Sequence, residues 1–251
     1  MTPLNWLAAV VDMLFSLPVL GRVAKWAWNS ILTIVHFTIG MIEYLLMLVN
    51  IMPEKKIRLG IVLFRDEEDK LLTGQENIIL VVEQAIEIYK TQAKIKLIPL
   101  TFRKGASENT EENDWVYNYP GNVGPDILDV QCNLGALLED LWITGAKYQT
   151  ISSTHLASTN FRRIVGYGAP IIVFIVRSIQ NYGGCSLGPL SDYVTIHKDH
   201  LHCLAHEVGH ACNLPHTKDK INLMHPNFCG NVEMTRWQIS MVRASRHVTV
   251  F

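Results

Sequence analysis

The stretch HEVGHACNLPH, residues 206–216, constrains the fold of this chain more than any other feature. His206 and His210 are four residues apart, so on an α-helix their imidazoles lie on one face, about one turn apart. Glu207 follows His206 directly and is offset from it by about 100° around the helix. Two imidazoles and a neighbouring carboxylate at this spacing are typical of a metal site in which the carboxylate accepts a proton from water.

A third histidine, His216, can reach the same metal only if the helix ends soon after His210. Asn213 predicts that end, because asparagine tolerates the left-handed conformation in which many helices stop. Pro215 then prevents the helix from resuming. A single histidine is more often a core or surface residue, but three of them around a helix stop indicate a metal site.

The first fifty residues contain two apolar runs, 4–20 and 26–52. A helix needs about 20 apolar residues to cross the hydrocarbon core of a bilayer, so the second run is long enough and the first is at the short limit. We expect residues 1–56 to form a membrane anchor of one or two transmembrane helices, a hairpin that turns at 21–25. Four aromatic side chains are candidates for anchors at the membrane interface: Trp6, Trp26, Trp28 and Tyr44.

Two alternatives for this segment are a cleaved signal peptide followed by a buried helix, and a soluble hairpin packed on the rest of the protein. The first lacks a basic segment before Leu4 and an obvious cleavage site. Asp12 and His36 would be costly in lipid, so we expect them to pair across the hairpin or to lie near an interface. The membrane side of the next domain stays open, because the basic residues around the second run favour the cytoplasm by only one charge.

Residues 57–251 are predicted to form one α+β domain. Apolar and β-branched residues predict strands at 56–64, 94–102, 126–132, 169–179 and 192–198. The strand at 169–179 is apolar on both faces and is therefore expected at the centre of the sheet. Helices are predicted across 134–148 and after two capping boxes, Thr73 with Glu76 and Thr235 with Gln238. The polar stretch 103–126 is predicted to be a loop.

The charge and the cysteine content of the chain exclude few classes of protein. The formal net charge is -1, with 22 Lys and Arg against 23 Asp and Glu, so the chain lacks the basic footprint of a nucleic-acid-binding protein. The five cysteines include no CxxC pair, and an odd number leaves at least one thiol unpaired within the chain. The cysteines could therefore form disulfides in an oxidising compartment or remain buried thiols in a reducing one, and the sequence does not distinguish these two alternatives.

Three segments carry a resemblance to a known family. Residues 206–216 resemble the HExxHxxGxxH zinc site of the metzincin metallopeptidases, with Asn213 in place of the family's glycine. NLMHP, residues 222–226, resembles the Met-turn that passes beneath the zinc in that clan, with Met224 as its methionine. LMHPNF is similar to the matrixin version, although His225 replaces an aromatic residue, and residues 234–248 resemble the closing helix of bacterial matrixin-like domains.

The resemblance implies a metzincin-like catalytic domain with a mixed twisted sheet, a long active-site helix and a C-terminal helix. It implies a membrane-anchored zinc endopeptidase that hydrolyses peptide bonds through a zinc-activated water. Zn²⁺ would be held by His206, His210 and His216, and Glu207 would be the catalytic base. The partners would be a peptide or protein substrate and the lipid bilayer, with no nucleic acid.

The resemblance also implies where the substrate binds. The residue just beyond the cut would lie against Pro226, Asn227 and Phe228, and an extended peptide would pair with an edge strand, for which 185–192 is the candidate. Two alternatives remain at this point. One is a membrane-anchored zinc-binding pseudoenzyme that acts as a binding or sensory module, against which the intact Glu207 argues. The other is a structural membrane protein without metal.

Overall fold

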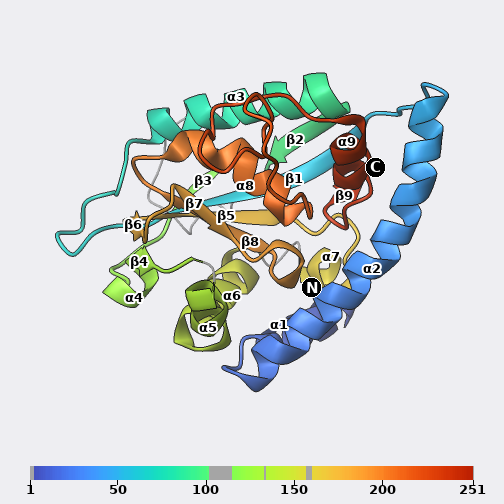
Figure 1. The fold of residues 1–251 in the computed structure, drawn as a ribbon. Coiled ribbons are helices and arrows are strands. Elements are labelled where there is room, and N and C mark those ends of the chain that lie inside the picture. Colours follow the sequence, from blue (N-terminus) through green and yellow to red (C-terminus); the bar gives the residue numbers. More distant parts are fainter. Residues whose placement is uncertain (1–2, 102–114, 133, 157–159, 251) are drawn as a thin grey trace.

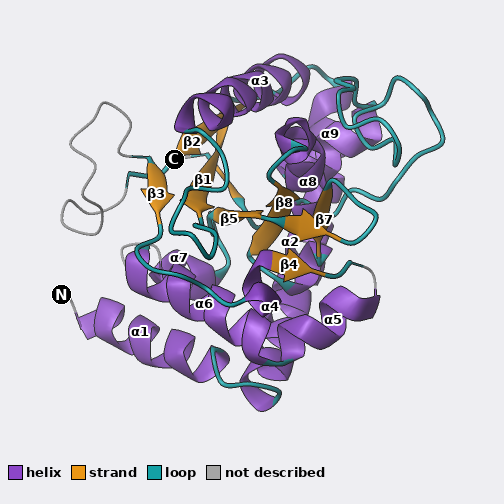
Figure 2. Ribbon diagram, turned by 90° about the vertical axis from the view of Figure 1, so that its left-hand side faces the viewer, coloured by secondary structure: helices purple, strands orange, loops and turns teal. Residues whose placement is uncertain are grey.

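In the computed structural model, which describes residues 3–101, 115–132, 134–156 and 160–250, a mixed β-sheet lies between layers of helices (Figures 1 and 2). The strand order is β2-β1-β5-β8-β7, and two further short strands, β3 and β9, pair with β1. β7 and β9 run antiparallel to their neighbours and the other pairs of this sheet are parallel. The α+β class and the mixed sheet are therefore confirmed. The strands are β1 Lys55–Leu63, β2 Ile95–Pro99, β3 Val116–Asn118, β5 Ile171–Val176, β7 Gly184–Ser186, β8 Tyr193–His197 and β9 Val248–Thr249.

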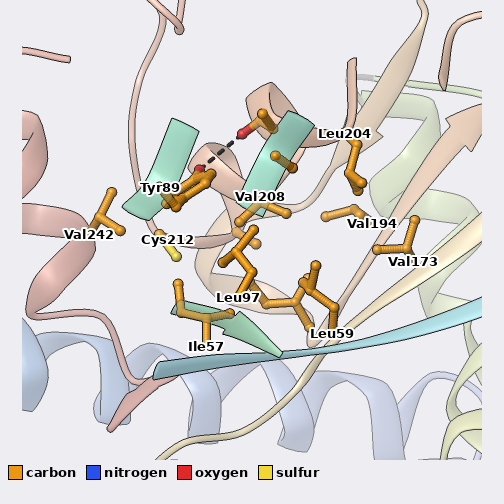
Figure 3. Packing of buried hydrophobic residues seen from close by; sticks show 14 of the residues in the cluster. Ile57, Leu59, Tyr89, Leu97, Val173, Val194, Leu204, Val208, Cys212 and Val242 are labelled. Atoms are coloured by element: carbon orange, nitrogen blue, oxygen red, sulfur yellow. Dashed lines mark hydrogen bonds between the residues drawn. The ribbon is translucent and has the colours of Figure 1, made fainter. Parts of the chain in front are cut away.

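The predicted central strand is confirmed, because β5 lies between β1 and β8 and all six of its residues are buried. One face of the sheet is covered by α3 (Gln75–Ala93), α8 (Leu204–Ala211) and α9 (Arg236–Arg243). In Figure 3, Leu59 of β1 and Val208 of α8 belong to the apolar core between these layers. The Tyr89 hydroxyl donates a 2.9 Å hydrogen bond to the Ala205 carbonyl, which fixes α3 to α8 (Figure 3).

A second apolar core lies on the opposite face of the sheet. It receives the alternate residues of each strand, because successive side chains along a strand point to opposite faces. Phe64 and Phe174 stack there with ring centroids 5.7 Å apart. Four helices cover this face: α4 Pro125–Leu128, α5 Leu134–Leu141, α6 Ile143–His155 and α7 Asn160–Val165.

One predicted strand, one predicted helix and the predicted loop differ in part from the structure. The strand predicted at 126–132 is extended only at Asp129–Val130 (β4), which pairs with Ser178–Ile179 (β6), because α4 begins at Pro125. The predicted helical segment at 134–148 is confirmed except at Trp142, where the chain breaks between α5 and α6. The predicted loop at 103–126 contains β3, which the parallel pairing with β1 stabilises. Residues 102–114 lie outside the described residues.

The two predicted capping boxes have different outcomes. Thr235 and Gln238 form theirs: the Gln238 amide donates to the Thr235 hydroxyl at 3.2 Å, and the Thr235 amide donates to the Gln238 side chain at 2.8 Å. The box predicted for Thr73 and Glu76 is wrong. Gly74 precedes the first turn of α3 instead, and no side chain caps it. Glycine is an acceptable residue at this position, which explains why the helix still begins there.

The predicted hairpin is present, but its turn is not at 21–25. α1 spans Pro3–Phe15 and α2 spans Leu20–Leu48, so the chain turns at 16–19. Gly21 to Lys25 lie within the first turns of α2, where Arg22 and Lys25 are buried in ion pairs with Asp140 and Asp192. Pairing with the rest of the chain therefore moves these two basic residues out of the predicted loop and onto the helix.

α2 is the one helix among the described residues that is long and apolar enough to cross a membrane by length and composition. It packs on α9 and on the 3-10 helix Gly188–Leu190 (η2), while α1 packs on α6 and α7. Of the two arrangements expected for Asp12 and His36, the pairing across the hairpin is wrong. Arg163 of α7 donates to Asp12 at 2.9 Å, because that face of α1 meets α7, and His36 stacks on Tyr167 instead.

Candidate metal centre

Three imidazoles converge at the end of α8. His206 and His210 lie one turn apart on this helix, which ends at Ala211, and Asn213 just after it is left-handed with a φ of 69°. The predicted left-handed stop is thus confirmed. The chain then returns, which brings the Nε2 atom of His216 to 3.3 Å from that of His206 and 3.0 Å from that of His210. The three residues form a group that could hold a metal ion.

The histidine-bearing helix α8 is short. It has eight residues, preceded by a 3-10 turn at Leu201–Cys203 (η3), and is not the long helix that the resemblance implies. Few residues separate the end of β8 from His206, so the chain enters the helix through this tight turn. The eight residues still span two helical turns, which is enough to present both His206 and His210 on one side.

Backbone carbonyls fix the orientation of the two helical imidazoles. His206 Nδ1 lies 2.7 Å from the Leu223 oxygen, and His210 Nδ1 lies 2.8 Å from the Leu214 oxygen. A carbonyl can only accept, so each Nδ1 carries the hydrogen and each neutral ring offers its Nε2 lone pair. Burial lowers the pKa of His206, and it lowers that of His210 to about 3, which keeps both rings neutral. Neutral imidazoles oriented by such outer hydrogen bonds fit a divalent transition metal.

Glu207 lies beside this group with its carboxylate in a buried setting. The residue is 4% exposed, and its Oε2 atom has no hydrogen-bond partner among the described residues. Burial raises the pKa of Glu207 to about 8. A cation held by the neighbouring histidines would favour the ionised carboxylate and so counter this effect of burial.

Gly184 of β7 makes room for that carboxylate. A Cβ atom on Gly184 would lie 2.5 Å from the Glu207 Oε1 atom, closer than side chains tolerate. The backbone of β7 therefore approaches the carboxylate as only glycine allows. Sequence reasoning did not identify Gly184, because nothing near it in the sequence indicates which side chain it will face.

The turn that follows the third histidine passes beneath α8. Met224 is fully buried there, and its amide donates to the Asn222 side chain at 3.0 Å. Asn222 and Gln238 exchange two side-chain hydrogen bonds, at 2.8 and 2.9 Å. Gln238 thus caps α9 and also holds this turn. His225 is not part of the metal-binding group, and its Nδ1 atom accepts from the Asn227 amide at 3.2 Å.

The three histidines and Glu207 line a cleft of about 900 Å³. One wall of the cleft consists of β7, Leu187 and Leu190. The other wall includes Pro226 and Asn227. Phe228 is not among the lining residues: it is 53% exposed and its ring packs on His225. β7 is the last strand in the sheet order, so the described part of the sheet leaves its outer edge unpaired, in the region predicted for the edge strand.

Two disulfides border the cleft. Cys132–Cys185 ties β7 to the chain after β4, and Cys203–Cys229 ties the start of α8 to the loop after Met224. Cys212 is the fifth cysteine and is a buried free thiol in the core. The sequence left this pairing open, because the partners are 53 and 26 residues apart and only the fold brings them together.

No model of a known protein family matches this chain, and no curated protein matches it. The three histidines, Glu207 and the cleft are therefore the features that indicate a function.

Proposed function

We propose that this protein is a zinc-dependent endopeptidase of the metzincin type, held at a membrane by its N-terminal helices. One observation carries the proposal: the imidazoles of His206, His210 and His216 converge beside the buried carboxylate of Glu207, at the base of a cleft. Three histidine nitrogens with room for a further ligand are typical of catalytic zinc sites.

Zinc, when bound by the three histidines, would polarise the scissile carbonyl and acidify an attacking water. Glu207 accepts the proton of that water and delivers it to the departing amine. Its carboxylate is suited to both steps, since Oε2 makes no competing hydrogen bond within the described residues. General acid–base catalysis by such a group contributes about 10²–10⁴-fold to the rate. The free edge of β7 binds the peptide in an extended conformation through backbone hydrogen bonds.

The alternative function is a zinc-binding module that senses or binds a partner without catalysis. Such a module needs neither a buried Glu207 nor the glycine at position 184 that makes space for it. The combination of the two favours a peptidase.

The disulfides support a location for the catalytic domain. Disulfides persist in oxidising compartments and are rare in the cytosol. Two of them border the same cleft, at Cys132–Cys185 and Cys203–Cys229. We therefore place the domain on the non-cytoplasmic side of the membrane, against the single-charge bias of the basic residues in the sequence.

Zinc content and peptide cleavage, measured on the purified full-length chain, test the function. We expect one zinc per chain in the wild type and in Glu207→Gln, with cleavage of casein or a peptide library reduced at least about 100-fold in Glu207→Gln. Glu83→Gln, on the exposed side of α3, is the matched control and should cleave normally. Stoichiometric zinc in the His206→Ala/His210→Ala double variant would exclude the metal site. Zinc without cleavage in the wild type would favour the non-catalytic module.

A further inference from the structure

The N-terminal helices expose an unusually large apolar surface. Between Leu4 and Ile51, 21 large apolar side chains are at least partly open to solvent, including Ile34 at 67%, Met41 at 65% and Leu45 at 62%. At about 100 Å² each, these side chains form a surface on the order of 2,000 Å², whereas the largest apolar patch on a typical soluble monomer is a few hundred Å². We name this surface the outer face of α1 and α2.

The charged side chains of α2 point the other way, into the protein. Arg22 pairs with Asp140 at 2.8 Å, and Lys25 pairs with Asp192 at 2.7 Å. Near the other end of the helix, Glu43 pairs with Arg243 at 3.0 Å and also with Lys55. The buried positions form two groups, 21–29 and 40–47, and no position between Asn29 and Gly40 is buried. The step from Asn29 to Gly40 is close to three whole helical turns, so both groups lie on one stripe, roughly a third of the helix circumference.

The outer face itself carries no Asp, Glu, Lys or Arg. All four such residues within α1 and α2 (Asp12, Arg22, Lys25 and Glu43) are buried in ion pairs. The exposed hydroxyl of Thr38 bonds to the Ile34 carbonyl of its own helix at 3.1 Å, so it presents no free donor. A surface without charge matches hydrocarbon better than it matches a protein partner, whose interface normally has a polar rim.

The ion pairs are incompatible with α2 crossing a bilayer. Arg22 and Glu43 are 21 residues apart, which is about 32 Å along a helix and therefore about the full thickness of the hydrocarbon core. Their partners Asp140 and Arg243 belong to the catalytic half of the chain. A spanning α2 would either draw these partners into lipid or leave buried charges unpaired, and both outcomes are strongly destabilising.

We infer that α1 and α2 lie parallel to the membrane, with the outer face in the acyl chains of one leaflet and the catalytic domain resting on that leaflet. Two exposed aromatic residues of the catalytic domain extend the surface beyond the helices. Trp237 of α9 lines an apolar groove with Phe37 and Tyr44 of α2, and Trp142 lies at the start of α6, next to the turn between α1 and α2. Tryptophan is enriched at the boundary between lipid and water. This position of α1 and α2 in one leaflet does not depend on peptidase activity.

A second copy of the chain fits this surface less well than lipid does. A standard interface buries about 800 Å² on each partner, well below the exposed apolar area. Because α2 lies on the outside of the molecule (Figure 1), a helix from another copy would contact only one strip of it. The rest of the exposed circumference would stay in water, whereas acyl chains can surround it.

The proposal that α1 and α2 lie parallel to the membrane is tested by determining on which side of the bilayer each end of α2 lies. Ser16→Cys, in the turn before α2, and Glu54→Cys, just after it, are each labelled with a membrane-impermeant maleimide on sealed vesicles before and after permeabilisation. The wild type measures the background labelling, since four of its cysteines form disulfides and Cys212 is buried. Glu83→Cys on α3 reports the side of the catalytic domain. We expect all three sites to react on the same side. Labelling of Ser16→Cys and Glu54→Cys on opposite sides would overturn the proposal.

Flotation with phosphatidylcholine–phosphatidylglycerol vesicles tests the outer face directly. The purified wild type should float with the vesicles, and the Ile34→Asp/Met41→Asp/Leu45→Asp variant should lose at least about ten-fold of the floating fraction. Leu80→Asp, which alters an exposed apolar residue on the distant α3, is the matched control and should float like the wild type. Zinc content shows that each variant is folded. A wild type that dimerises in solution and does not float would identify a second copy as the occupant.

Discussion

Met224 lies directly against Gly209, the residue of α8 that falls between His206 and His210. A Cβ atom on Gly209 would come within 2.5 Å of the Met224 sulfur. A side chain at position 209 would therefore force Met224 or α8 to shift. This contact joins two of the three segments that carry the resemblance, the histidine stretch and the turn with Met224.

Gly209→Ala should therefore destabilise the protein. The added methyl group must displace Met224 or the helix, and overpacking of this kind costs about 1–3 kcal/mol. Met224→Ala makes space for the methyl group, so the double variant should lose less stability than the sum of the two single variants. Urea unfolding of the four proteins gives the coupling free energy. Additive losses would show that the two residues do not compete for the same space.

Removal of the metal should lower the melting temperature. A ligand that binds only the folded state stabilises it by about 4 kcal/mol at 1,000 times its dissociation constant. For a protein of this size that corresponds to a shift of roughly 10 °C on chelation with EDTA. Calorimetry or scanning fluorimetry in detergent measures the shift. The His206→Ala/His210→Ala variant should show no response to EDTA, and an equal response there would locate the stabilising metal elsewhere.

Asp192 should be among the most sensitive positions for stability. Its buried carboxylate lies 2.7 Å from Lys25 Nζ and 3.5 Å from Arg163 Nε, and it also pairs with Arg246. Asp192→Asn leaves three buried cations without their shared anion, and breaking a buried pair in this way costs about 3–5 kcal/mol. Asp199→Asn, at an exposed carboxylate, is the control and should unfold like the wild type. Denaturant titration of both variants measures their free energies of unfolding, and an equal loss in both would contradict the prediction.

The residue just beyond the cut should be apolar, with a preference for Leu, Met or Phe. Leu187 and Leu190 line the cleft with Pro226 and present an apolar surface to a bound side chain. One methylene in such a pocket is worth about 1–3 kcal/mol, and the preference should be graded. Leu187→Ala should shift the cleavage sites in a peptide library, whereas Phe228→Ala should shift them less, because Phe228 is outside the lining. The reverse order would restore Phe228 as the pocket wall.

Short-range features of the candidate site were predictable. The four-residue spacing of His206 and His210 and the helix stop at Asn213 depend on local backbone geometry, which a few consecutive residues determine. The position of His216 followed from that stop. The central strand at 171–176 was also predictable, because an unbroken apolar run can be satisfied only by burial on both faces. Gly184, by contrast, gave no local signal.

The sequence by itself determined the local elements: the histidine helix and its end, the buried strand, and an apolar N-terminal segment. Only the tertiary structure decided where the charges and cysteines of these elements find partners. Arg22 and Lys25 were expected in a loop, but they meet Asp140 and Asp192, more than a hundred residues away, and this contact moves the turn to 16–19. The reason is physical: helix periodicity is set within a few residues, whereas an ion pair or a disulfide forms only between groups that the complete fold brings together.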